Sequence, residues 1–338
     1  MRLPAFLVLA LLVSCIPATS SSAQTTSPDN SQRVRGVELY NQQNYTEARR
    51  LLKQAVKKDK SDADAWYYLG LALLEDPKVL KDSSKAFETA TKLRPNFAAA
   101  HAGLAYVLLF RNKNDAAARE AQVALTINPK VSDAYYVRGV TRLRAGAKKE
   151  ALQDAESAIK LTPQLAPAYL LKSEALVGFI GDAMIATDDA SKESGKDRYR
   201  QAEEALEKYL QLAPTDPYRA TWVQQLESLK YFAYTPKPGE PKLVYSGKEV
   251  TTKVRVLSKP EPGYTETARS KGVTGTVVLR CVFTAEATVK HCLILSALPR
   301  GLTEQAIRAA RQITFIPATF EGHPVSIYIQ LEYNFNLY

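Results

Sequence analysis

Few side chains in this 338-residue chain have the types and spacing that support chemistry. The three histidines, His101, His291 and His323, stand far apart and form no metal-ligand motif. The sequence contains no nucleophile elbow, zinc-protease helix, Cys-x-x-Cys pair or glycine-rich phosphate loop. We therefore predict no catalytic residue, no cofactor and no metal site. An envelope hydrolase would need a nucleophile–base pair that is not found.

Asp62/Asp64 and Asp188/Asp189 are acidic residues that stand close together in the sequence. Paired carboxylates serve general acid–base catalysis only when they converge in space. Here a solvated helix start and a surface loop explain them better. These pairs do not change the prediction of a non-enzymatic protein.

Two cysteines are placed for a cross-strand disulfide. The sequence predicts two antiparallel strands on either side of a four-residue loop, 285–288. That loop brings Thr284 opposite Val289 and Cys281 opposite Cys292. Opposed Cβ atoms on such strands are about 4.5–5.5 Å apart, within reach of a disulfide. We predict a Cys281–Cys292 disulfide, with two free half-buried thiols as the alternative.

The first residues have the pattern of an export signal. Arg2 precedes the uncharged run 3–13, which is too short to span a bilayer core, since a helix needs about 20 residues for that. Two cleavage sites compete. Cleavage after Ala23 gives a signal peptide over 1–23, whereas the lipobox-like sequence ending at Cys15 would give an acylated N-terminal cysteine. Either reading predicts a protein of the periplasm or cell envelope, and in the second it is lipid-anchored.

A polar linker over 24–30 leads into an internal repeat. Similar phrases end at Pro95, Pro129, Pro163 and Pro214, and the gaps between them are 34, 34 and 51 residues. Small residues recur twelve positions earlier in each copy, namely Ser83, Ala117, Ala151 and Ala202. The pattern resembles the tetratricopeptide repeat family, with about five units over 31–216. It predicts an α-solenoid domain over 31–233, closed by a capping helix at 218–232.

The repeat resemblance implies a concave face that binds peptides or partner proteins. In the family's frame this face presents Tyr67, Leu71, Tyr106, Phe110, Tyr136 and Val140. The alternative is that these side chains pack between the helices. The longer gap holds an insertion around 178–198, whose Ser, Asp and Gly content predicts a surface loop.

A proline-rich linker over 234–250 separates the repeats from a second domain over 251–338. There the hydrophobic period changes from 3.6 to 2. The elements expected are strands at 275–284 and 289–296, a helix at 303–312 with Thr303 as its N-cap, and a strand at 324–337. This β-β-α-β order predicts a small α+β domain with a three-stranded antiparallel sheet.

The second domain resembles the TonB C-terminal domain family. The resemblance rests on Tyr264, Ala268-Arg269, Gly272-Val273-x-Gly275-x-Val277-Val278, Leu302, Ala306, Ala309, Phe315-x-Pro317-Ala318-x3-Gly322-x-Pro324-Val325 and Phe335-x-Leu337. Two positions depart from the family: Thr265 replaces a proline, and 285–288 lacks the usual turn glycine. The resemblance implies energy transduction in the periplasm, in which this domain binds an extended peptide of an outer-membrane transporter.

The final strand is the expected peptide-binding edge, because three strands and one helix leave unpaired backbone groups at the sheet edges. The residues that would face the peptide are Ser326, Tyr328, Gln330, Glu332 and Asn334. In the alternative, a homodimer partner or the segment 243–257 covers this edge.

The composition excludes other classes of protein. The net charge of +10 is spread along the chain rather than gathered in a Lys/Arg stripe, which argues against nucleic-acid binding. Typical TonB proteins have an uncleaved membrane helix, and a cleavable signal does not provide one. The alternative function is therefore a non-energised periplasmic scaffold or assembly adaptor, whose second domain dimerises or binds cell wall.

Overall fold

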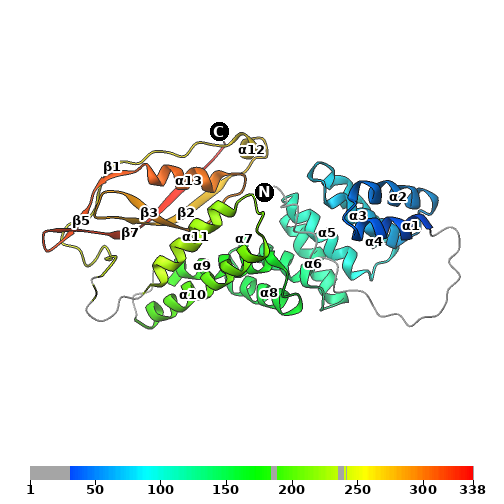
Figure 1. The fold of residues 1–338 in the computed structure, drawn as a ribbon, viewed down its shortest axis with the longest axis horizontal. Coiled ribbons are helices and arrows are strands. Elements are labelled where there is room, and N and C mark those ends of the chain that lie inside the picture. Colours follow the sequence, from blue (N-terminus) through cyan, green and yellow to red (C-terminus); the bar gives the residue numbers. More distant parts are fainter. Residues whose placement is uncertain (1–30, 184–188, 235–239, 241, 338) are drawn as a thin grey trace. The chain divides into compact units, whose positions relative to one another are not determined.

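The computed structural model describes residues 31–183, 189–234, 240 and 242–337 (Figure 1). The predicted signal peptide, both cleavage sites and Cys15 lie outside these residues. Contacts divide the chain into two compact units that separate between Lys172 and Ser173. The predicted domain limits, 31–233 and 251–338, remain a prediction.

The first unit consists of antiparallel helix pairs. The helices are α1 (Ser31–Asn41), α2 (Tyr45–Lys58), α3 (Ala63–Leu74), α4 (Leu80–Leu93), α5 (Ala98–Phe110), α6 (Asn114–Ile127), α7 (Ser132–Arg144), α8 (Lys148–Leu161) and the start of α9 (Ala166–Ala183), with a 3₁₀ turn, η3 (Pro77–Val79), before α4. Each helix packs against the next in sequence along α1 to α8. This arrangement confirms the predicted α-solenoid.

Small residues at the repeat positions allow the helices to approach closely. A Cβ atom added at Gly70 on α3 would lie 2.8 Å from the Phe87 ring, and one at Gly103 on α5 would lie 2.6 Å from the same ring. Phe87 on α4 is fully buried between them. The glycines therefore make room for one aromatic side chain that joins consecutive repeats.

The predicted surface loop at 178–198 is wrong for the residues that the structure describes. Helix α9 continues to Ala183, and α10 (Asp189–Leu212) begins at Asp189. The insertion therefore lengthens two helices. Its Ala, Glu, Lys and Arg residues are good helix formers, and their propensity outweighs the turn-forming Ser and Gly. Helix α11 (Arg219–Ala233) follows.

As predicted, the C-terminal sheet has three antiparallel strands, and the structure shows their order to be β3–β2–β7. They are β2 (Gly275–Phe283), β3 (Val289–Ser296) and β7 (Ile327–Phe335). Helix α13 (Leu302–Arg311) packs against β2 and β3. The β2–β7 register has no break and pairs Leu279 with Leu331. This confirms the small α+β fold.

Four shorter strands and a short helix complete the unit. Strand β1 (Arg255–Ser258) pairs with β4 (Thr314–Ile316), β5 (Ala318–Phe320) pairs with β6 (His323–Val325), and α12 (Glu266–Arg269) precedes β2. The expected strand at 324–337 is therefore divided between β6 and β7. Glu321 and Gly322 close the β5–β6 hairpin with φ values of 52° and 82°, a backbone geometry that favours glycine.

The predicted N-cap of α13 is also wrong. Gly301, with φ of 82°, is the N-cap. The Thr303 hydroxyl instead accepts from the Leu298 N–H and donates to the Leu298 carbonyl, both at 2.9 Å. The side chain thus fixes the loop before the helix rather than the helix end.

Candidate peptide-binding edge

Strand β7 is an edge strand, because β2 is its one neighbour in the described sheet. Backbone groups of alternate residues point to opposite edges of a strand. The carbonyls of Ser326 and Glu332 point away from β2, since they accept from the Tyr245 N–H at 2.8 Å and from Lys259 Nζ at 3.1 Å. Gln330 and Asn334 lie an even number of residues from Ser326 and Glu332. Their N–H and C=O groups therefore also point away from β2.

The segment before the sheet covers only the start of this edge. Tyr245 forms an isolated parallel bridge with Ile327, and its ring lies 5.1 Å from that of Phe320. Further along, Thr252 pairs with Thr319 of β5 rather than with β7. Within the described residues, no backbone group pairs with the outer side of β7 from Gln330 to Asn334. In the described structure, the segment 243–257 therefore covers the β7 edge only at the start of the strand, where Tyr245 contacts Ser326 and Ile327.

The side chains predicted to face a peptide divide into two groups. Gln330, Glu332 and Asn334 are exposed, whereas Ser326 and Tyr328 are half-buried. The Ser326 hydroxyl accepts from the Ala285 N–H at 3.2 Å. Two of the exposed side chains contact each other, since Gln330 Nε2 donates to Glu332 Oε1 at 3.0 Å.

Tyr328 is held against a buried cation rather than presented to solvent. The guanidinium of Arg280 on β2 lies 3.9 Å from the Tyr328 ring centroid and 5.1 Å from that of Phe232 on α11. Arg280 Nη1 donates to Tyr199 Oη of α10 at 2.9 Å. Burial lowers the pKa of Arg280. Sequence reasoning missed this contact, because nothing in the sequence relates β2 to α10 and α11.

Helix α11 packs on β3 and closes the opposite edge of the sheet at one position. The Ile294 N–H donates to Gln225 Oε1 at 2.8 Å, and Gln225 Nε2 donates to the Ile294 carbonyl at 3.3 Å. The amide thus occupies both backbone groups that a further strand would use. The predicted capping helix therefore also covers the sheet.

Cys281 and Cys292 are joined by a disulfide, with Cα atoms 4.1 Å apart. Both side chains are buried in the core between the sheet and α13. A covalent link at this point fixes β3 against β2, the central strand with which β7 pairs.

The register that was expected to bring these cysteines together is wrong near the turn. Val289 pairs with Phe283 rather than with Thr284. The register then shifts between Arg280 and Val282. His291, with φ of 43°, lies in this irregular stretch, and its ring stacks on Tyr231 of α11 at 4.0 Å. Between the pairs Val282–Lys290 and Arg280–Leu293, β3 has one residue more than β2. This extra residue brings Cys292 back to the level of Cys281.

The predicted concave face of the repeats is contradicted for four of its six residues. Tyr67, Leu71, Tyr106 and Tyr136 are 1% to 8% exposed and belong to the core between helices. Phe110 and Val140 are half-buried. The alternative of packing between helices describes the buried four, because successive helix pairs cover their rings and methyl groups.

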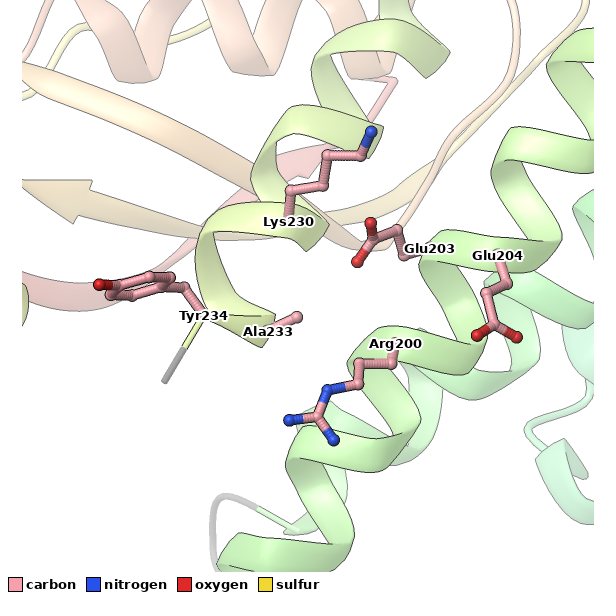
Figure 2. Close-up of a pocket in the computed structure, with 6 residues that line it drawn as sticks. All are labelled: Arg200, Glu203, Glu204, Lys230, Ala233 and Tyr234. Carbon is pink, nitrogen blue, oxygen red and sulfur yellow. The ribbon is translucent and has the colours of Figure 1, made fainter. Parts of the chain in front are cut away.

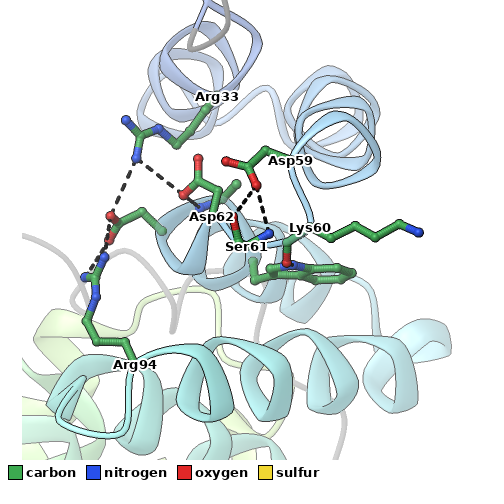
Figure 3. Close-up of polar contacts among 9 residues, drawn as sticks. Arg33, Asp59, Lys60, Ser61, Asp62 and Arg94 are labelled. Atoms are coloured by element: carbon green, nitrogen blue, oxygen red, sulfur yellow. Dashed lines mark hydrogen bonds and ion pairs between the residues drawn. The ribbon is translucent and has the colours of Figure 1, made fainter.

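The acidic pair at the start of α3 belongs to a structural network (Figure 3). Asp62 is the N-cap and accepts from the Ala65 N–H at 2.9 Å. Arg94 donates to both carboxylate oxygens of Asp64, at 3.0 and 2.8 Å, and Arg33 lies 3.5 Å from Asp64. These carboxylates join neighbouring repeats and do not form an acid–base pair.

A shallow cavity of about 360 Å³ lies between α10 and α11 (Figure 2). It is lined by Arg200, Glu203, Glu204, Lys230, Ala233 and Tyr234. Lys230 pairs with Glu207 at 2.6 Å, so charges of both signs compensate one another around it. In the described parts of the chain, no cluster of His, Cys, Asp and Glu could hold a metal ion. No helix there is long and apolar enough to cross a bilayer.

Two family models match separate parts of the chain. The model described as the Gram-negative bacterial TonB protein C-terminal matches residues 260–337. The tetratricopeptide repeat model matches residues 34–79, 80–132 and 112–166. A search of curated proteins gives no match.

Two solved structures show a likeness to part of this chain. A thermophilic tetratricopeptide repeat protein of Thermus thermophilus is 19% identical, with a TM-score of 0.44, and the match covers 60% of this chain and 99% of that chain. MamA from Desulfovibrio magneticus RS-1 is 20% identical, with a TM-score of 0.42, covering 57% of this chain and 99% of that chain.

Proposed function

This chain carries tetratricopeptide repeats and a Gram-negative TonB C-terminal domain, and from this combination we propose an exported, non-catalytic coupling protein of the periplasm. In this proposal the repeats recruit a protein partner, and the sheet binds an extended peptide of an outer-membrane transporter. The signal-like N-terminus supports export, whether the mature protein starts after Ala23 or carries lipid on Cys15.

The observation that carries the proposal is the difference between the two edges of the sheet. Gln225 occupies both outward backbone groups of Ile294 on β3. On β7 the Glu332 carbonyl accepts from Lys259 Nζ, whereas Gln330 and Asn334 on either side direct their N–H and C=O groups outwards. An incoming strand gains affinity from backbone hydrogen bonds and specificity from alternate side chains. The β7 edge from Gln330 to Asn334 is therefore the proposed binding surface.

A proline at position 330 tests this surface. Proline is tolerated at edge strands when its missing N–H would point outwards, so Gln330→Pro should leave the sheet folded. The probe is a set of fluorescent peptides copied from the periplasm-facing N-terminal segments of outer-membrane transporters. We expect Gln330→Pro to weaken anisotropy-measured binding at least tenfold. Gln330→Ala, the matched control, keeps the N–H and should stay within about threefold of the parent. Equal binding by the two variants would exclude this edge.

The scaffold alternative makes a different prediction for the same variants. If β7 instead pairs with β7 of a second copy, the parent protein sediments as a dimer, and Gln330→Pro converts it to a monomer without any transporter peptide present. Sedimentation equilibrium of the full chain distinguishes this outcome from peptide capture by a monomer.

A further inference from the structure

A lysine side chain lies against the outer edge of β7. Lys259 follows directly after β1, and its exposed side chain donates from Nζ to the Glu332 carbonyl at 3.1 Å. The same ammonium lies 4.7 Å from the centroid of the Tyr333 ring. Within the described residues, no carboxylate forms an ion pair with it. Because an ammonium has three N–H donors, Lys259 keeps further donors, and a charge without an anionic partner, at this edge.

The chain is anchored on both sides of this lysine. Before it, β1 pairs with β4. After it, the Tyr264 ring packs edge-on against the ring of Phe335 at the end of β7, with 5.6 Å between the centroids. Pro260 and Pro262 stand between these anchors, and each proline ring fixes its own φ. The backbone at Lys259 is therefore held in place, and it is the side chain that can swing away from the edge.

The Glu332 carbonyl is one of the outward groups that an added strand would use, so a strand bound at β7 must displace the Lys259 ammonium. We propose that Lys259 selects, among the extended peptides that bind β7, those that carry a carboxylate beside Glu332; this inference rests on the proposed function. A displaced ammonium exchanges a carbonyl acceptor for a carboxylate, and hydrogen bonds between two charged groups are about twice as strong as neutral ones. A peptide without a carboxylate breaks the contact between Lys259 and Glu332 and offers the ammonium no replacement.

The two faces of β7 determine where that carboxylate lies. Neighbouring side chains on a strand project to opposite faces, so Glu332 and Tyr333 face different sides. Lys259 lies over the Tyr333 ring and therefore on the Tyr333 face. A peptide carboxylate on the other face would lie beside the like charge of Glu332, which is unfavourable for opposed residues. The acidic residue of the peptide should therefore be a sequence neighbour of the residue that pairs with Glu332.

The test uses the full chain and the fluorescent transporter peptides, in a scan that makes one residue at a time Glu, Gln or Lys. For the parent, we expect the Glu version to bind about fivefold more tightly than the Gln version at one position, and the Lys version to bind most weakly. High salt should remove most of this difference. Lys259→Glu should reverse the order, so that the Lys version binds most tightly. Lys259→Met, which keeps an aliphatic side chain over Tyr333, should bind the Glu and Gln versions equally. Lys290→Glu is the matched control, because Lys290 is an exposed lysine of β3 at the other edge of the sheet, and it should keep the parent's preference.

The same peptides separate this inference from the proposed function. If they bind the parent and Gln330→Pro weakens them, β7 is the binding edge. Equal affinity for the Glu and Gln versions at every position would then overturn the role of Lys259 alone. A preference for Glu that persists unchanged in Lys259→Met, or that is lost in Lys290→Glu, would overturn it as well. If no peptide binds the parent, or if binding is unchanged in Gln330→Pro, the proposed function fails and the role of Lys259 fails with it.

Discussion

Replacing Arg280 tests how the sheet is attached to the helices α10 and α11. The side chain is 6% exposed, stacks on Tyr328 and Phe232, and donates to Tyr199. Three variants separate its roles. Arg280→Met removes the charge and keeps most of the volume, Arg280→Lys keeps the charge and loses the planar stack, and Arg280→Ala removes both charge and volume.

The favourable and unfavourable contributions of the guanidinium are of similar size. Its hydrogen bond to Tyr199 contributes about 1.5–3 kcal/mol, and a desolvated stack on Tyr328 contributes about 2 kcal/mol. Burying the charge costs several kcal/mol. Arg280→Met should therefore change the free energy of unfolding by no more than about 1 kcal/mol. Arg280→Ala also leaves a cavity and should lose about 3 kcal/mol, and Arg280→Lys about 2 kcal/mol because an ammonium is more strongly hydrated.

Tryptophan fluorescence can follow the relevant unit alone. The chain has two tryptophans, Trp66 on α3 and Trp222 on α11. In a Trp66→Phe background, urea unfolding followed by fluorescence reports the unit that contains the sheet. The expected order of stability is parent and Arg280→Met together, then Arg280→Lys, then Arg280→Ala. If Arg280→Met loses as much stability as Arg280→Ala, the favourable contacts of the guanidinium outweigh the cost of burying its charge. The reasoning that these two contributions cancel is then refuted.

Three further predictions concern stability. Replacing both Cys281 and Cys292 by alanine should lower the free energy of unfolding by about 3 kcal/mol on the chain-entropy model for their separation of 11 residues; reductant should destabilise the parent but leave this variant unchanged. Gly103→Ala places a Cβ 2.6 Å from the Phe87 ring and should cost about 1–3 kcal/mol, seen as a lower melting temperature of the repeats. Burial raises the pKa of Asp133 from 3.8 to about 7, so the folded chain holds a proton that the unfolded chain releases, and stability should fall as pH rises between these values. This loss of unfolding free energy should be at most about 4 kcal/mol. Asp133→Asn should abolish it, and a variant whose stability still fell over the same pH range would contradict this assignment.

The sequence was sufficient to predict the repeats and the small α+β domain. The 34-residue spacing of prolines and small residues reflects contacts between neighbouring helices, which are local in sequence. The alternation in β2 and β3 likewise predicted their strands within one residue at each end. The insertion differs from its predicted loop, because the propensity of its helix formers outweighs that of Ser and Gly.

Contacts between distant segments were decided only by the tertiary structure. The stacking of Arg280 on Phe232, and the pairing of Gln225 with Ile294, join residues about 50 to 70 positions apart, and no period or motif records such a pairing. The irregular register beside His291 depends on how β3 is held by both the turn and α11.

The candidate sites divide in the same way. Alternation along the last strand placed Ser326, Tyr328, Gln330, Glu332 and Asn334 on one face, because a period of two determines which residues share a face. It did not determine that Ser326 and Tyr328 are half-buried while the other three are exposed. Burial of Tyr67 and Tyr106 was not determined by the repeat frame, since exposure depends on which side chains the next helix brings against them.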